Sequence, residues 1–422
     1  MTASATSDGK DPEYTLPSEK GENTPSVNHA SKFDSITASE DLQEREAEEK
    51  SLLRKIDWNI LPLLTLSYLL QFLDKTSLGN TGVMGIIPDT KLVGQEFSWL
   101  SSVFYFGYLA ASYPLSVAFV KYPLGKVLSI SIIAWAIILG CHGAANNFAG
   151  LVVLRILLGA CESAISPGFS LMTGIWYGAL YLKLAEARPQ KKQHSFKDTK
   201  WEKAQFIEAM VDPKTWIISL IIGVASLANG VVANFGSLII TSLGFDTLTT
   251  LLMNLPGSAV SFVATIVLTG LTSRVRRSRI LLCICSWLTA ILGFLLIREL
   301  PTSNKYGRLV GAWLMNAFAA AFPLLLSLLA TNVTGFTKKA TVQAHFFIFY
   351  CAGNIAGPQL FISKEKPRYL TAYNGCIGSL CAVIVLAIIL RFYLDWENKR
   401  TRSRVCILTP RPKIFSRTIW MK

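Results

Sequence analysis

The chain has 422 residues, of which 51% are hydrophobic and only 16% are charged, and its mean hydropathy is +0.40. Soluble globular domains carry roughly 25% charged residues, and a dry core cannot hide successive uncharged runs of about 20 residues. The composition therefore argues against a water-soluble enzyme and favours a membrane protein.

The net charge of +14 is distributed unevenly along the chain. Residues 1–50 hold 5 Lys or Arg and 12 Asp or Glu, so the remaining chain is strongly basic. Its basic residues lie between apolar runs, which is the pattern of membrane loops and argues against a nucleic-acid partner. The eight cysteines include no Cys-x-x-Cys pair, so we expect packing residues, with no metal site and no cofactor.

The apolar runs predict an all-α integral membrane protein with about ten spans. A polar N-terminal tail over 1–55 is expected to be disordered, with at most a short helix from Glu40 to Lys50. Four runs predict an N-terminal bundle over 56–177, and a polar stretch predicts a linker over 178–214. Six more runs predict a C-terminal bundle over 215–396, and a basic tail follows over 397–422. The runs lie near 59–87, 99–120, 127–143, 149–176, 216–243, 248–271, 280–297, 309–330, 342–361 and 369–394.

The loop charges predict the orientation of these spans. If the N-terminus is cytosolic, the linker, the arginines between 274 and 279 and the C-terminal tail all face the cytosol, and the outer loops carry fewer basic residues. Both termini are then cytosolic, because ten is even. Two blocks of spans around one long linker are typical of two-bundle transporters, which usually have six plus six spans. With four spans followed by six, the first bundle is incomplete.

Four charged residues fall well inside the predicted spans, away from their ends, and all four are in the first bundle: Asp74, Lys75, Arg155 and Glu162. Charge in the hydrocarbon costs several kcal/mol, so each is a functional candidate. Asp74 lies near mid-membrane if its helix continues to about residue 87. The alternative is a helix that ends at residue 73 and leaves Asp74 at the interface.

Arg155 and Glu162 are seven residues apart and share one helix face. They form either a structural ion pair, with each other or with neighbouring helices, or a titratable carboxylate beside a water-filled path. Two acids with two cations suit proton-coupled carriage of an anion, because the cations attract the anion and the acids take up protons.

Uncharged polar residues mark the second bundle, and we take Asn229, Asn234 and Asn354 as candidate substrate contacts. The alternative is interhelical hydrogen bonding in close-packed helices. His345 is either a proton relay or, more commonly for a single histidine among phenylalanines, a packed side chain.

Several motifs resemble the fungal anion:cation symporters of the major facilitator superfamily, nearest to the allantoate permease branch. The resemblance covers about residues 52–400. The motifs are Tyr68-Leu-Leu-Gln-Phe-Leu-Asp74-Lys75, Tyr122-Pro-Leu-Gly125-Lys126, Arg155-x-Leu-Leu-Gly159-x-x-Glu162 and Gly353-Asn354-x-x-Gly357.

The resemblance implies proton symport of a small organic anion, allantoate or a related carboxylate, by alternating access in the plasma membrane. It implies proton coupling by Asp74 and Glu162, substrate contact by Lys75 and Arg155, and a gating loop at Gly125 and Lys126. We expect a monomer whose partners are the anion, protons and the lipid bilayer.

The chain departs from the family pattern after Tyr177, where roughly 80 residues, enough for the fifth and sixth spans, are missing. An alternative function is therefore a truncated, non-transporting form, either an inactive isoform or a sensor or partner of a full-length permease. The loops carry no phosphate-binding glycine motif, nucleophile constellation or metal cluster, so we do not expect an enzyme.

Overall fold

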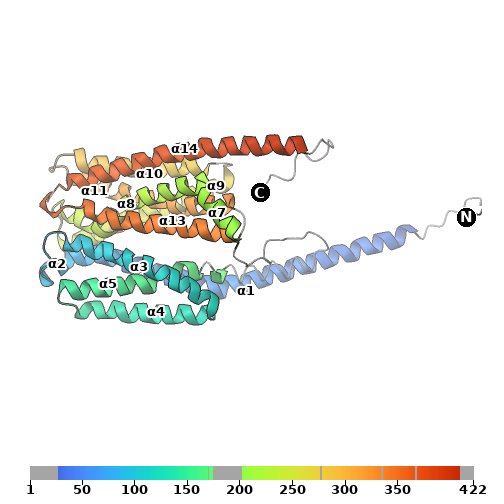
Figure 1. Ribbon diagram of the computed structural model, residues 1–422, viewed down its shortest axis with the longest axis horizontal. Helices are drawn as coiled ribbons and strands as arrows, with labels where there is room; N and C mark the ends of the chain where they lie inside the picture. The colour runs from blue at the N-terminus through green and yellow to red at the C-terminus, as the bar shows by residue number, and fades with distance from the viewer. Residues whose placement is uncertain are drawn as a thin grey trace, which may run out of the picture.

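The computed structural model describes residues 27–169, 171–173, 202–275, 278–333, 336–365 and 368–408, and within these residues it contains helices but no strand. Figure 1 shows two groups of long, roughly parallel helices. The first group consists of α1 (Val27–Met84), α2 (Ile86–Asp89), α3 (Glu96–Lys121), α4 (Leu124–Cys141) and α5 (Phe148–Glu162). The second consists of α7 (Lys203–Val211), α8 (Pro213–Thr241), α9 (Thr247–Arg274), α10 (Arg279–Glu299), α11 (Lys305–Leu314), α12 (Ala321–Asn332), α13 (Phe336–Ala356) and α14 (Leu370–Leu408).

Helix α1 is longer than expected at both ends of its predicted span. It begins at Val27 and projects beyond the bundles (Figure 1), so the prediction of a disordered tail is wrong for residues 27–55. These residues are rich in Glu, Ala, Leu and Lys, which have high helix propensity. The helix also continues to Met84, which contradicts the alternative of a helix ending at residue 73. Residues 1–26 lie outside the described part of the chain.

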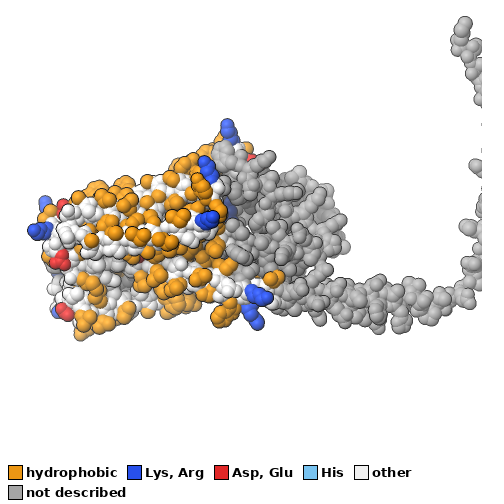
Figure 2. Space-filling model, turned by 90° about the horizontal axis from the view of Figure 1, so that it is seen from below, with side chains coloured by type: hydrophobic (Ala, Val, Ile, Leu, Met, Phe, Trp, Pro, Cys, Tyr) orange, Lys and Arg blue, Asp and Glu red, His pale blue; other side chains and the backbone are white. Residues whose placement is uncertain are grey.

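Eight of the described helical segments are long and apolar enough to cross a membrane. Helices α3 and α13 have 26 and 21 residues, which is also spanning length, but they carry more polar side chains. The total of ten spans therefore remains a prediction. Figure 2 shows that the sides of the bundles are apolar and that Lys and Arg side chains gather at the two ends, as a bilayer-embedded protein requires.

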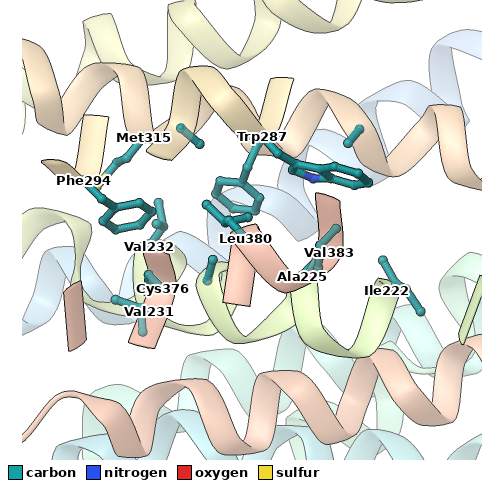
Figure 3. Close-up of a cluster of buried hydrophobic side chains, with 14 of the residues drawn as sticks. Ile222, Ala225, Val231, Val232, Trp287, Phe294, Met315, Cys376, Leu380 and Val383 are labelled. Carbon is teal, nitrogen blue, oxygen red and sulfur yellow. The ribbon is translucent and has the colours of Figure 1, made fainter. Parts of the chain in front are cut away.

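A buried apolar core holds the second group together around α8. Trp287 and Phe294 of α10 are 1% and 0% exposed and pack among Val231, Leu380 and their neighbours (Figure 3). Helix α13 lies against α8 across a seam of glycines. A Cβ atom on Gly353 would lie 2.0 Å from the carbonyl oxygen of Gly223, so only glycine permits this approach.

A second glycine seam joins α3 to α5 in the first group. A Cβ atom on Gly107 would lie 2.0 Å from the carbonyl oxygen of Ile156, and one on Gly159 would lie 2.0 Å from that of Phe104. Because Glu162 follows Gly159 by about one helical turn, this close contact sets the position of the Glu162 carboxylate relative to α3.

The two bundles contact each other at the end opposite to the start of α1. Asn80 of α1 accepts a hydrogen bond from Ser237 of α8 at 2.7 Å. Ser102 of α3 donates to the carbonyl of Ile355 at 2.7 Å and accepts from Gln359 at 3.0 Å. These contacts join α1 and α3 to α8 and α13 and close that end of the seam between the bundles.

The linker helix α7 is fixed to the second bundle by ion pairs. Lys338 at the start of α13 contacts Glu208 of α7 at 2.8 Å and Asp212 at the end of α7 at 3.0 Å. Lys214 of α8 also contacts Asp212 at 3.7 Å, and it pairs with Glu397 of α14 at 2.7 Å. Desolvation lowers the pKa of Lys338, but its hydrogen bonds to Glu208 and Asp212 outweigh this effect and raise the pKa above the ordinary value. The linker segment 174–201 lies outside the described residues.

Candidate functional site

The structure pairs Lys75 of α1 with Glu162 of α5. Lys75 Nζ lies 3.9 Å from Glu162 Oε1, and the side chains are 26% and 0% exposed. Neither carboxylate oxygen of Glu162 has a hydrogen-bond partner among the described residues. The carboxylate is thus fully buried, with the Lys75 cation at the outer limit of ion-pair distance and the Gln71 amide nearby, so it retains its capacity to bind a proton or a donor group.

Asp74, the other predicted coupling acid, is buried and bound differently. Trp135 of α4 donates its indole N–H to Asp74 Oδ2 at 2.7 Å, while Oδ1 has no partner among the described residues. Asp74 and Lys75 are adjacent in α1, so they project about 100° apart around the helix. As a result, Asp74 points toward α4 while Lys75 approaches α5.

Arg155 is buried on α5 at 8% exposure and lies within electrostatic range of Asp74 and Glu162. No ion pair closes between Arg155 and Glu162 in the described structure, and Glu162 instead pairs with Lys75 of the neighbouring helix α1. Gln71 is also buried, and its amide nitrogen has no partner among the described residues. The site therefore holds polar groups whose hydrogen-bonding capacity is unused, which is unusual for a buried cluster.

Aromatic side chains from both bundles surround Lys75. The Nζ atom lies 5.8 Å from the ring centroids of Phe104 and of Tyr108 on α3, within cation–π range. Tyr105 of α3 faces Tyr350 of α13, with ring centroids 6.1 Å apart. Tyr350 of the second bundle thus lies beside the charged cluster of the first bundle.

The three predicted asparagines do not form one group. Asn229 of α8 donates to Asn354 of α13 at 2.7 Å, and Asn354 donates to the carbonyl of Tyr350 at 2.8 Å. These two amides thus join the helices on the side of Tyr350. Asn234 instead donates to the carbonyl of Gly230 in its own helix at 2.8 Å, and its backbone lies against Gly79 of α1. Asn234 therefore belongs to the contact between the bundles.

The predicted gating residues lie away from the charges. Gly125 and Lys126 belong to the first turn of α4, about 14 Å along the helix axis from Trp135. Gly125 has open space around it, and Lys126 is exposed. They remain candidates for a gate and do not contact the charged cluster.

His345 is either a proton relay or a packed side chain. It forms a hydrogen bond with Ser219 at 2.8 Å and meets Trp216 edge to face, with ring centroids 4.6 Å apart. This geometry favours the packed side chain. Among the described residues, no group of three His, Cys, Asp or Glu side chains is placed to hold a metal ion.

Sequence reasoning missed the polar and aromatic neighbours of the charges. Gln71 stands one turn before Lys75, a spacing that could have identified it. Trp135 and Tyr350 give no such signal, because they come from other helices and look like ordinary apolar-run aromatics. The missed residues are Gln71, Phe104, Tyr105, Tyr108, Trp135 and Tyr350.

Residues 64–185 match the family model of the Major Facilitator Superfamily. An uncharacterized transporter of Schizosaccharomyces pombe is 30% identical, with 89% of this chain and 85% of the relative covered. The Allantoate permease of Saccharomyces cerevisiae is 29% identical, with 84% and 80% covered. The first alignment runs over 449 residues, more than the 422 of this chain, so that relative holds internal residues that this chain lacks.

Solved structures support the same fold. A mutant form of the nucleoside transporter NupG superposes with a TM-score of 0.56 at 13% identity and covers 79% of this chain and 98% of its own. A bacterial homolog to the human lysosomal transporter Spinster, in an inward-facing and unoccupied conformation, superposes with a TM-score of 0.53 at 15% identity and covers 78% and 94%. The family match, the relatives and the helical fold together show that the chain is a multi-pass membrane transporter that belongs to the Major Facilitator Superfamily.

Proposed function

We propose that the chain carries a small organic anion, allantoate or a related carboxylate, together with protons. The observation that carries this proposal is the Glu162 carboxylate, which is fully buried, has no hydrogen-bond partner among the described residues and lies 3.9 Å from Lys75. A buried acid beside a cation can exchange that cation for a proton, which is the elementary step that coupling requires.

The charge balance of the cluster supports proton coupling. Asp74 and Glu162 offset Lys75 and Arg155, so the four side chains have no net formal charge when all are ionised. An anion that binds Lys75 withdraws the cation from Glu162 and leaves a negative charge buried without compensation. Because such a charge costs several kcal/mol, uptake of a proton by Glu162 would accompany binding of the anion.

Alternating access suits the arrangement of the two bundles. The charges lie on α1 and α5, and Tyr350 of α13, whose carbonyl accepts a hydrogen bond from Asn354, lies within electrostatic range of Lys75. A substrate between the bundles would contact both groups, and rocking of one group against the other would expose it to each side in turn. We place the protein in the plasma membrane with both termini in the cytosol, in accordance with the loop charges.

Uptake of labelled allantoate by permease-deficient yeast that express the full chain tests this proposal. We expect accumulation to be greater at acid than at neutral pH and to be abolished in Glu162→Gln and Asp74→Asn. Glu299→Gln, an exposed acid at the end of α10, is the matched control and should transport normally. If the protein reaches the membrane and a panel of carboxylates is not taken up, the proposal is refuted.

A second candidate is a non-transporting partner of a full-length permease. It is favoured by the internal residues that the Schizosaccharomyces pombe relative has and this chain lacks. It predicts co-purification with an intact permease and no uptake by this chain alone. Uptake by the chain when it is expressed without such a permease would exclude it.

A further inference from the structure

A groove runs between α9 and α10 on the membrane-facing side of the second bundle. Its volume is about 480 Å³, and its walls include Ala259, Val263 and Val267 of α9, Cys285 and Thr289 of α10, and Ala317 below them. Val263 and Val267 are more than half exposed, so the groove opens toward the hydrocarbon. The groove lies apart from Lys75 and Glu162, because no residue that contacts either side chain lines it.

The groove is chemically apolar even where its residues carry hydroxyl groups. Ser286 Oγ donates to the carbonyl of Ala317 at 2.6 Å, and Thr289 Oγ1 donates to the carbonyl of Cys285 at 2.9 Å. Because both hydroxyl protons are committed to the backbone, the walls present mainly methyl and methylene groups. The ligand segment that fits such walls is therefore a hydrocarbon.

The length of the groove suits an acyl chain. Its lining on α9 extends from residue 259 to residue 268, which is about 14 Å and close to the depth of one bilayer leaflet.

Positive charge lies at one end of the groove. Arg274 ends α9 and is exposed, about 9 Å beyond Leu268, and α10 begins at Arg279. Arg279 is held in place by the carbonyl of Ser327 at 3.3 Å and by Thr331 Oγ1 at 2.8 Å. The N-terminus of α10 adds its dipole, because its N-cap Ser278 bonds back to Val275 and does not cap the helix.

We propose that this groove binds one anionic phospholipid, with an acyl chain between α9 and α10 and the phosphate at Arg274 and the start of α10. An apolar slot of one-leaflet depth with arginines at its mouth matches the two parts of such a lipid in order and in spacing. A zwitterionic phospholipid of the same chain length would gain the apolar contacts and little from the charge.

Native mass spectrometry of the purified full chain tests this proposal. The chain is exchanged into micelles that contain either dioleoyl-phosphatidylserine or dioleoyl-phosphatidylcholine, and the retained lipid is counted. We expect one retained phosphatidylserine and weaker retention of phosphatidylcholine. Arg274→Gln should weaken phosphatidylserine binding about fivefold, the effect of one basic residue near a membrane surface. Val263→Trp should fill the groove and abolish retention.

Matched variants separate this site from general lipid contact. Leu252→Trp is equally exposed on α9 but lies outside the groove, and Arg298→Gln removes an arginine at the other end of α10. Both should retain phosphatidylserine as the parent chain does. Equal retention of the two lipids, equal losses in the control variants, or retention of a second protein copy would overturn the proposal. If Val263→Trp fails to fold, the phosphatidylserine retention of Arg274→Gln alone decides whether the proposal holds.

Discussion

Removal of either partner of the Lys75–Glu162 pair should destabilise the protein more than removal of both. At 3.9 Å and an effective dielectric constant of about 20, two unit charges attract by about 4 kcal/mol. Desolvation of Glu162 offsets much of this attraction, and water screens Lys75, whose side chain is 26% exposed. We therefore expect a coupling free energy of about 1–3 kcal/mol between the two side chains.

The assay is a double-mutant cycle of Lys75→Gln and Glu162→Gln, with unfolding in detergent followed by intrinsic fluorescence. Lys75→Gln leaves a buried carboxylate without its nearest cation and should cost about 3 kcal/mol, and adding Glu162→Gln should restore part of that loss. The control cycle uses Arg298→Gln and Glu299→Gln, an exposed pair at 3.3 Å for which we expect less than about 1 kcal/mol. If the shorter, exposed pair couples as strongly as the buried one, the reasoning from burial is refuted.

Two further variants, each with a matched control, test the packing around the site by the same unfolding measurement. Trp135→Phe should cost about 1.5–3 kcal/mol, because the buried Asp74 carboxylate loses its only described donor, whereas the exposed Trp99→Phe should cost little. Gly159→Ala should destabilise by about 1–3 kcal/mol through overpacking against α3, whereas Gly378→Ala, which faces open space, should stabilise α14. Equal effects within either pair would contradict these assignments.

Lys338→Gln should cost about 2 kcal/mol by releasing α7, while the neighbouring exposed Lys339→Gln should have little effect. Because the pKa of Lys338 is raised in the folded protein, its contribution is complete below the ordinary lysine pKa of about 10.4 and is lost only as pH rises through the folded-state value. The cost should therefore be the same at pH 6 and pH 9, and a change between these values would contradict the ion-pair interpretation.

The sequence alone was sufficient to identify the class of the protein and the candidate site residues. Apolar runs of spanning length and basic loops identify a membrane bundle, because hydrocarbon excludes charge whatever the tertiary arrangement. The same cost makes Asp74, Lys75, Arg155 and Glu162 conspicuous in the first bundle. Sequence failed for residues 27–55, where polar composition predicted disorder and the high helix propensity of the same residues extends α1.

Only the tertiary structure decided how the candidates are paired. Helical periodicity shows that Arg155 and Glu162 share a face of α5, but the Glu162 ion pair is with Lys75 of α1. Likewise, Asp74 binds Trp135 of α4, and Asn229 binds Asn354. The physical reason is that a 3.6-residue period sets directions within one helix, whereas partners between helices depend on the rotation and approach of each pair. The rotation and approach of a helix pair depend in turn on glycine seams such as the one between α3 and α5, which bring particular helix faces within contact distance.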